Sequence, residues 1–167
     1  MINEFSRTEM LIGAEKMNTL KNSTVAVFGV GGVGSHAVEA LARCGVGRLI
    51  LVDNDTVSLT NINRQSIALH STIGQFKTRV MKEKIADICP GTQVITFEEF
   101  VLPDNIESLF EHMELQMGQG NSVDYILDAI DTVTAKLALA GFAASHGIPV
   151  IASMGTGNKL HPELLRI

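Results

Sequence analysis

Short apolar runs alternate with helix-like stretches along this chain. Five runs of four or five mostly apolar residues are spaced widely enough to hold helices between them: 25–28, 48–52, 93–97, 123–127 and 149–152. Runs of this length are typical of strands buried in a sheet. Because strands that alternate with helices pair in parallel, the pattern predicts an α/β fold. We expect a doubly wound, mostly parallel, Rossmann-like sheet with helices on both faces.

Between the runs, apolar residues recur at helical spacing. One helix is predicted over 75–89, where Pro90 and Gly91 follow as stop signals, and its apolar face comprises Phe76, Val80, Met81, Ile85 and Ile88. Further helices are predicted over 35–44, 104–112 and 134–145. The last of these is nearly apolar throughout, which is typical of a helix pressed between the sheet and another surface.

Length and composition predict one domain over residues 1–167. The chain has 167 residues, of which 46% are hydrophobic, enough for one α/β domain with a substantial core and too little for two. No stretch approaches the ~20 apolar residues of a membrane span. The N-terminus lacks a basic-then-apolar targeting signal. We therefore expect a cytoplasmic protein without a membrane segment.

Charge and cysteine content narrow the possible partners. The net charge of −5 argues against a basic surface that tracks nucleic acid over a whole face, although a local patch remains possible. Four basic residues lie close together on one predicted helix: Lys77, Arg79, Lys82 and Lys84. Such a run is usually a solvated face. Cys44 and Cys89 form no C-x-x-C pair, so a zinc knuckle is unsupported within this chain, and we expect both to be buried.

The first apolar run leads into a glycine-rich turn. Gly29, Gly31 and Gly34 satisfy G-x-G-x-x-G, which permits a tight turn, a close approach of backbone to phosphate and close packing of the next helix. The amides and dipole at that helix's N-terminus form an anion site. Asp53 follows the second strand, 19 positions after Gly34, near the spacing at which an acid binds a ribose hydroxyl. The pattern favours a bound nucleotide over a turn that merely packs a helix.

Two later cations distinguish ATP from a dinucleotide. A dinucleotide pyrophosphate carries about two negative charges and can be held by the turn alone, whereas ATP carries about four and usually needs cations. Arg64 lies in the segment Asn61-Ile62-Asn63-Arg64-Gln65, and Lys77 opens the next helix. An arginine can fork onto phosphate oxygens, and a lysine can act as a point charge. Either one alone would be interpreted as a surface cation, but together they favour ATP.

The fourth strand ends in two carboxylates, Asp128 and Asp131. Asp131 is placed to hold Mg²⁺ against the phosphates, since Mg²⁺ usually takes one or two carboxylates together with phosphate oxygens and water. Asp128 either shares that role or caps the following helix or hydrogen-bonds backbone. Because ligands gather at the carboxyl ends of parallel strands, Gly29, Asp53, residues 128–131 and Ser153 should line one crevice.

At these residues the chain resembles the adenylating-enzyme superfamily, which includes ubiquitin-activating enzymes and the bacterial activators of molybdopterin and thiamine biosynthesis. Five motifs occur in the order that this family uses: Gly29-x-Gly31-Gly32-x-Gly34-Ser35, Asp53-x-Asp55, Asn61-x-x-Arg64-Gln65, Lys77 and Asp131. Within the superfamily, segments 60–65, 100–105 and 128–136 look most like those of tRNA threonylcarbamoyladenosine dehydratases. Family members normally continue past this point, so the chain resembles the N-terminal portion of a longer member.

The resemblance implies ATP and Mg²⁺ as cofactors. Glycine amides would contact the phosphates, Asp53 the ribose, and Asp131 the metal. The other implied cofactor-binding positions are Gly29, Gly31, Gly32, Gly34, Asp55, Asn61 and Gln65, and the implied catalytic residues are Arg64, Lys77, Asp131 and Arg7. Arg7 looks like the family's N-terminal arginine that reaches the ATP of a partner subunit, which implies a homodimer.

The implied reaction is ATP-dependent activation of a carboxylate. A carboxylate oxygen attacks phosphorus while Arg64, Lys77 and Mg²⁺ offset the charge of the phosphates. In a dehydratase the carboxylate belongs to the threonyl group of a modified tRNA adenosine, and ring closure expels the activated oxygen. Three alternatives stay open: adenylation of the C-terminal glycine of a ubiquitin-like sulfur carrier, an NAD-dependent oxidoreductase, and a non-catalytic nucleotide sensor.

Overall fold

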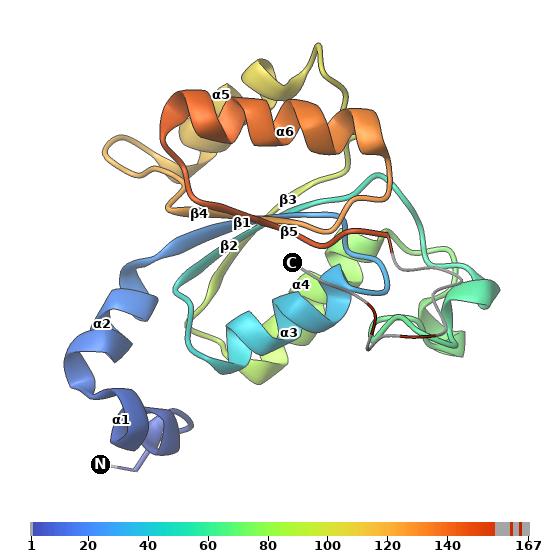
Figure 1. The fold of residues 1–167 in the computed structure, drawn as a ribbon. Helices are drawn as coiled ribbons and strands as arrows, with labels where there is room; N and C mark the ends of the chain where they lie inside the picture. Colours follow the sequence, from blue (N-terminus) through green and yellow to red (C-terminus); the bar gives the residue numbers. More distant parts are fainter. Residues whose placement is uncertain (1, 156–160, 162–163, 165–167) are drawn as a thin grey trace.

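A parallel sheet forms the centre of the molecule. The computed structural model describes residues 2–155, 161 and 164. Within them a five-stranded sheet has the order β3-β2-β1-β4-β5, and every neighbouring pair is parallel (Figure 1). The strands are β1 (Thr24–Phe28), β2 (Arg48–Val52), β3 (Gln93–Phe97), β4 (Tyr125–Asp128) and β5 (Val150–Ala152). The predicted doubly wound α/β fold is confirmed.

The strand order reverses beside β1. From β1 the chain adds β2 and β3 on one side, then crosses back to add β4 and β5 on the other. Phe28 pairs in register with Val52 on one flank and with Asp128 on the other, so these strands end level. Ligands of open α/β sheets bind outside the carboxyl ends of the strands at such a reversal.

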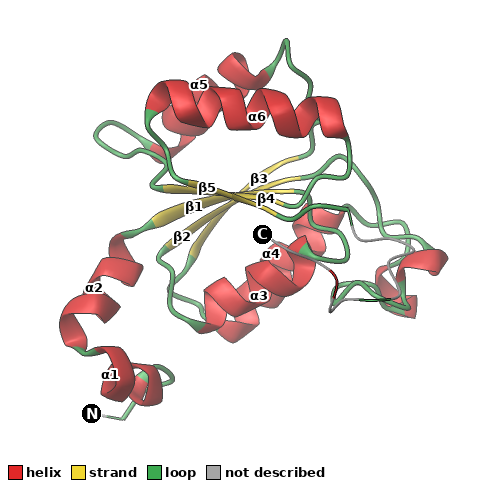
Figure 2. Ribbon diagram, viewed as in Figure 1, coloured by secondary structure: helices red, strands yellow, loops and turns green. Residues whose placement is uncertain are grey.

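Helices cover both faces of the sheet (Figure 2). One face packs against α3 (Gly34–Arg43) and α4 (Lys77–Ile88), and the other against α5 (Ile106–Met117) and α6 (Val133–His146). Successive residues of β1 point to opposite faces, so Phe28 enters one core and Val27 the other. In the core that contains Phe28, beneath α5 and α6, the Phe110 ring stacks on Phe28 and Phe142, with centroid distances of 5.8 and 4.1 Å.

Most predicted elements are present, with shifted ends. The strands over 48–52 and 93–97 match β2 and β3, whereas the fourth strand begins two residues later than predicted. The helix predicted over 104–112 is α5, and it continues to Met117 because Met113 and Met117 extend its buried stripe. Within the described part of the chain, no helix is long and apolar enough to cross a membrane.

Two N-terminal helices were not predicted. They are α1 (Ser6–Ile12) and α2 (Ala14–Asn22), and neither buries a residue. They extend away from the sheet on the side of the N-terminus (Figure 1). Two short 3₁₀ helices, η1 (Leu59–Asn61) and η2 (His70–Thr72), also lie in the connection between β2 and α4. Without an apolar stripe, such segments leave no helical period in the sequence.

The expectation of two buried cysteines is half wrong. Cys89 is buried, but Cys44 is exposed. Cys44 follows the last residue of α3, where its backbone N–H caps the helix by donating to the Ala40 carbonyl 3.0 Å away. At such an end the side chain turns toward solvent rather than toward the core.

Candidate functional site

A cleft of about 810 Å³ opens at the carboxyl ends of the strands. It lies beyond the ends of the paired strands β1 and β4, at the reversal of strand order. Of the residues predicted to line it, Gly34, Arg7 and the buried Asp128 do not. The others do: Gly29, Gly31, Gly32, Asp53, Asp55, Asn61, Arg64, Gln65, Lys77 and Asp131. Ser153 also lines the cleft, as expected from its place at the end of β5.

The glycine turn has two kinds of position. Gly29 has φ of 88°, and a Cβ there would lie 2.7 Å from the Ala129 carbonyl oxygen. At Gly34 a Cβ would collide with the Gly29 carbonyl oxygen. By contrast, a Cβ at Gly31 would meet only the Gln65 side chain, 3.8 Å away. Gly29 and Gly34 therefore permit close packing, while Gly31 and Gly32 leave backbone open toward the cleft. Gly34, predicted to bind the cofactor, packs α3 onto the turn.

Asp53 fixes the glycine turn to the end of β2. Its Oδ2 accepts the Val30 N–H at 2.7 Å, and its Oδ1 accepts the Asp55 N–H at 2.8 Å. A carboxylate has about four acceptor positions, so each oxygen can still accept a hydroxyl from a ligand. The carboxylate therefore both shapes the turn and presents acceptors to the cleft.

Arg64 lies over the glycine turn. Its Cγ and Cδ are each 3.6 Å from the position that a Cβ on Gly32 would take. The guanidinium donates from Nη1 to the Thr60 carbonyl at 2.9 Å and to Asn63 Oδ1 at 3.0 Å. Asn61 braces this segment, because its Oδ1 accepts the Ser58 N–H at 2.9 Å. The cation is thus anchored beside open backbone amides.

Lys77 is a buried cation rather than part of a solvated face. Its side chain is 6% exposed, and Nζ lies 2.6 Å from Asp55 Oδ2. The backbone is tied at the same place, since the Lys77 N–H donates to the Asp55 carbonyl at 3.0 Å. Lys77, the first residue of α4, therefore lines the cleft with both its backbone and its ammonium group held by Asp55.

The interpretation of the basic run as a solvated face is wrong for the buried Lys77, but Arg79 and Lys82 are exposed as expected. Lys84 and Arg79 are nevertheless paired with acids. Lys84 Nζ lies 2.6 Å from Glu39 Oε2, and the hydrogen bond from Lys84 lowers the pKa of the Glu39 carboxyl. Arg79 binds Glu98 through two hydrogen bonds of 2.6 and 2.9 Å, which lower the pKa of the Glu98 carboxyl and raise the pKa of Arg79. Such pairs cannot be recognised from one helix's sequence alone, because the acids lie on other elements.

The two carboxylates after β4 differ in their surroundings. Asp128 is 2% exposed, and its Oδ1 accepts the Ile130 N–H at 3.0 Å, which confirms the prediction that it hydrogen-bonds backbone. Asp131 is exposed and makes no hydrogen bond or ion pair with any residue that the structure describes. In the same described part, no three His, Cys, Asp or Glu side chains gather to hold a metal ion. A carboxylate without a protein partner at the cleft is compatible with Mg²⁺, which takes most of its ligands from phosphate and water.

Several lining residues were missed by the sequence reasoning. Glu99, Phe100 and Val101 follow β3, and Met154 follows Ser153, all at the same edge of the sheet. Phe100 is 49% exposed, which is unusual for so large an apolar ring. Its position after the end of β3 was the available signal, but an apolar ring at that position gives no chemical indication of binding.

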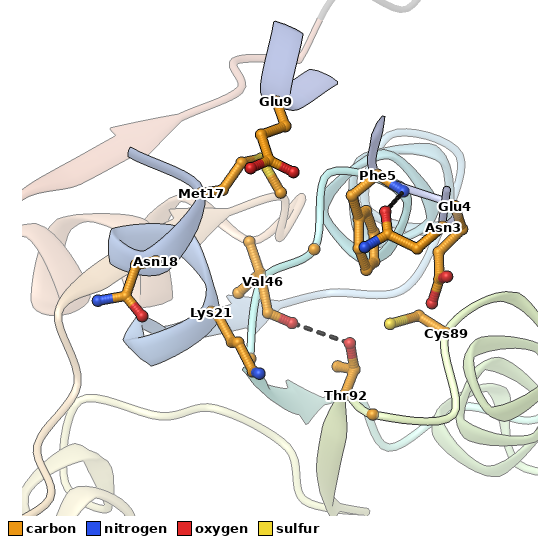
Figure 3. A pocket seen from close by; sticks show the side chains of 13 residues that line it. Asn3, Glu4, Phe5, Glu9, Met17, Asn18, Lys21, Val46, Cys89 and Thr92 are labelled. Carbon is orange, nitrogen blue, oxygen red and sulfur yellow. Dashed lines mark hydrogen bonds between the residues drawn. The ribbon is translucent and has the colours of Figure 1, made fainter. Parts of the chain in front are cut away.

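A second hollow, of about 420 Å³, lies at the amino ends of the strands, opposite the cleft (Figure 3). It is bounded by the N-terminal helices and by the turns that precede β2 and β3, where Thr92 Oγ1 donates to the Val46 carbonyl at 2.9 Å. Phe5 and Glu9 line it. Arg7 lies between them in α1, so it is at the amino ends of the strands, away from the cleft of its own chain.

Comparisons with known proteins agree with the motif order. The ThiF family matches residues 5–162. The tRNA threonylcarbamoyladenosine dehydratase of Bacillus subtilis (strain 168) is 48% identical over 167 residues, covering 100% of this chain and 62% of that protein. The adenylyltransferase and sulfurtransferase UBA4 of Vanderwaltozyma polyspora is 33% identical over 147 residues, covering 88% of this chain and 31% of that protein. The chain thus spans less than two thirds of the length of these curated relatives.

A solved structure shares the fold. The crystal structure of Escherichia coli tRNA N6-threonylcarbamoyladenosine dehydratase, TcdA, in complex with ATP matches with a TM-score of 0.85 at 37% identity. The match covers 96% of this chain and 62% of that chain. At this identity the similarity extends beyond fold to family.

Proposed function

The chain belongs to the ThiF family, and we propose that its cleft binds Mg-ATP in order to activate a carboxylate. The observation that carries this proposal is the position of the two later cations. Arg64 lies against Gly32, and Lys77 is buried at the cleft beside Asp55. Cations at the glycine turn suit a polyanion longer than a pyrophosphate, so they favour ATP over NAD.

Different residues of the chain would bind the phosphates and the ribose of the nucleotide. The open backbone N–H groups of Gly31 and Gly32 donate to phosphate oxygens, and the N-terminus of α3 adds its dipole. The remaining acceptor positions of Asp53 receive the ribose hydroxyls. Arg64 and Lys77 take the outer phosphates, where charge develops as phosphorus is attacked.

Asp131 is the residue we propose to hold Mg²⁺. It is the carboxylate of the β4 end that remains without a partner in the described part of the chain, whereas Asp128 is engaged. When bound, the metal neutralises phosphate charge and orients the phosphorus for attack.

The proposed substrate is the threonyl carboxylate of threonylcarbamoyladenosine in tRNA. One carboxylate oxygen attacks an ATP phosphorus, the bond from that phosphorus to the remainder of ATP breaks, and a mixed anhydride forms. A nucleophilic atom of the substrate's own carbamoyl group then attacks the activated carbonyl carbon and loses its proton. The carboxylate oxygen departs with the phosphate group, giving the cyclic dehydrated form. With two cations and a metal at the phosphates, positioning and electrostatics suffice, and no protein nucleophile is needed. Such a substrate would place the reaction in the cytoplasm.

A homodimer belongs to the same proposal. Arg7 lies at the amino ends of the strands, so within one chain it is remote from the cleft. In a homodimer it would supply a further cation to the outer phosphate in the partner's cleft, and α1 would cross between subunits.

Adenylation of a ubiquitin-like sulfur carrier is the second candidate, because a UBA4 protein is 33% identical to this chain. The 48% identity to a tRNA-modifying relative favours the first. The full-length protein should consume ATP when given threonylcarbamoyladenosine-containing tRNA, and not when given a sulfur carrier. Stimulation by the carrier alone would reject the tRNA proposal, and calorimetry showing tighter binding of NAD than of Mg-ATP would reject both.

A further inference from the structure

A buried ion pair spans the connection that carries Asp131. Asp128, the last residue of β4, is 2% exposed, and Lys136, in the first turn of α6, is 8% exposed. Lys136 Nζ lies 3.0 Å from Asp128 Oδ2. Asp131 lies between the two ends of this pair in the sequence. The mechanism proposed above uses neither partner.

Asp128 and Lys136 depend on each other. Lys136 Nζ is buried and has no hydrogen bond of good geometry within the described residues, so its contact with Asp128 is electrostatic. Removing either charge would leave the other buried without compensation, which is costly. The pair therefore holds the Asp128 carboxylate in one orientation.

That orientation shapes the backbone that leads to Asp131. Asp128 Oδ1 accepts the Ile130 N–H at 3.0 Å, a local turn in which the side chain binds backbone two residues on. The flanking backbone is fixed as well, because the Ala129 N–H donates to the Phe28 carbonyl at 2.8 Å and the Ser153 N–H to the Asp128 carbonyl at 2.8 Å. Ala129 in turn packs against Gly29. The turn thus sets where the Asp131 carboxylate faces the glycine turn.

We propose that Lys136 is a positioning residue: through Asp128 it holds the 128–131 turn so that Asp131 presents its carboxylate to the metal of Mg-ATP. The effect on Mg-ATP binding rests on the proposed function. The positioning of the 128–131 turn rests on the ion pair and the hydrogen bonds described above. Residues that orient a metal ligand typically change metal affinity by about tenfold to a hundredfold when removed.

The geometric part is tested without nucleotide, by amide hydrogen exchange followed by NMR. In Lys136→Met, the Ile130 amide should exchange at least about tenfold faster, because its acceptor is no longer held in place. The Asp55 amide, which donates to the side chain of Asp53 two residues before it, serves as internal control and should not change. Lys82→Met removes an exposed lysine and is the matched control variant. An unchanged Ile130 rate in Lys136→Met overturns the proposal.

If Lys136→Met does not fold, the Asp128→Asn/Lys136→Met double variant replaces it. Asparagine keeps an oxygen for the Ile130 N–H but offers a neutral, unanchored acceptor. Exchange at Ile130 should still be faster than in the wild type, and an unchanged rate overturns the proposal here too.

The functional part compares ATP affinity with and without Mg²⁺ by calorimetry. Lys136→Met should lose about tenfold or more of the affinity that Mg²⁺ adds, while metal-free ATP binding changes little. In an Asp131→Asn background the same substitution should have no further effect. An equal loss in that background means that Lys136 does not act through Asp131, and the proposal fails. A wild-type chain that binds no Mg-ATP contradicts the proposed function, while the exchange rates still decide the role of Lys136.

Discussion

At the scale of single residues, many polar side chains of the cleft bind the protein's own groups. Asp53 accepts two backbone N–H groups, and Asp55 pairs with Lys77. Asp131 is left without a partner among the described residues. The cleft is therefore held in shape before a ligand arrives, which lowers the entropic cost of binding.

Arg64 gives a direct test of the proposed phosphate site. Arg64→Ala should weaken Mg-ATP binding by about tenfold to a hundredfold, the worth of hydrogen bonds from a charged donor. Calorimetry measures this, with Lys82→Ala as a control of equal charge change on an exposed part of α4. Equal affinities for the wild type and Arg64→Ala would remove Arg64 from the site.

Gly34 tests the packing role of the turn. Gly34→Ala should lower the free energy of unfolding by about 1–3 kcal/mol, because the new Cβ would overlap the Gly29 carbonyl oxygen. Gly91→Ala has no heavy atom within 4 Å of its new Cβ and should change stability by less than about 0.5 kcal/mol. Denaturant unfolding of both variants decides, and similar stabilities would contradict the packing role.

The role of a residue could be predicted where a sequence motif defines that role. It was harder to predict where the role depends on packing against distant parts of the chain. The spacing of Gly29, Gly31 and Gly34 marked the turn, but only the approach of the Gly29 carbonyl shows that Gly34 faces the helix packing and not the cleft. Phe100 was missed because an apolar residue after a strand carries no chemical signal. The partner of Lys77 lies 22 positions away, beyond any local pattern.

At the scale of elements, α3 and α4 are linked by the Lys84 and Glu39 pair. The pKa of Glu39 is lowered from its ordinary value of 4.5, chiefly by the hydrogen bond from Lys84. A carboxyl whose folded pKa is lowered contributes stability above its unfolded pKa and loses it as pH falls through the folded value.

Glu39→Gln should therefore destabilise the protein slightly at pH 7, by less than about 1 kcal/mol, because both side chains are partly solvated. The difference from the wild type should shrink as pH falls below 4.5 and the wild-type carboxylate is protonated. Denaturant unfolding across pH measures the difference, with Glu83→Gln on the exposed side of α4 as control. A difference that grows toward acid would contradict this account.

Helix periods predicted the packed helices well and the unpacked ones not at all. α4 and α5 bury stripes that recur every three or four residues, so their existence was readable and only their ends were shifted. α1 and α2 bury nothing. An amphipathic pattern arises because one face of a helix is buried, so a helix that buries no residue cannot be predicted from such a pattern.

At the scale of the whole molecule, the strand order places the cleft. Alternation of strands and helices predicted a doubly wound sheet, and the carboxyl-end rule predicted one crevice. The order β3-β2-β1-β4-β5 confirms both, since Gly29, Asp53 and Asp131 come from three successive neighbours and line one cleft. The role of Arg7 stays a prediction, because it concerns two chains.

Arg7 can be tested by mixing subunits of the full-length protein. Arg7→Ala and Arg64→Ala proteins should each show low ATP turnover with the tRNA substrate, because each lacks one of the proposed cations at the phosphates. If Arg7 serves the partner's cleft, mixed dimers contain one cleft with both cations, so mixing should restore up to about a quarter of wild-type turnover per dimer population. No recovery in dimers shown to have exchanged subunits would contradict the crossing.

The two N-terminal helices have a consequence for their own folding. At 7 and 9 residues they fall below the ~12–15 residues at which an isolated helix becomes marginally stable in water. Neither helix contains a buried residue, and Leu20 of α2 is only partly buried against the core, so their coil-to-helix equilibrium should depend on what they dock against. If α1 docks on a second copy in the proposed homodimer, the magnitude of the ellipticity at 222 nm should fall on dilution as the subunits separate, while the signals of the aromatic core around Phe110 remain constant.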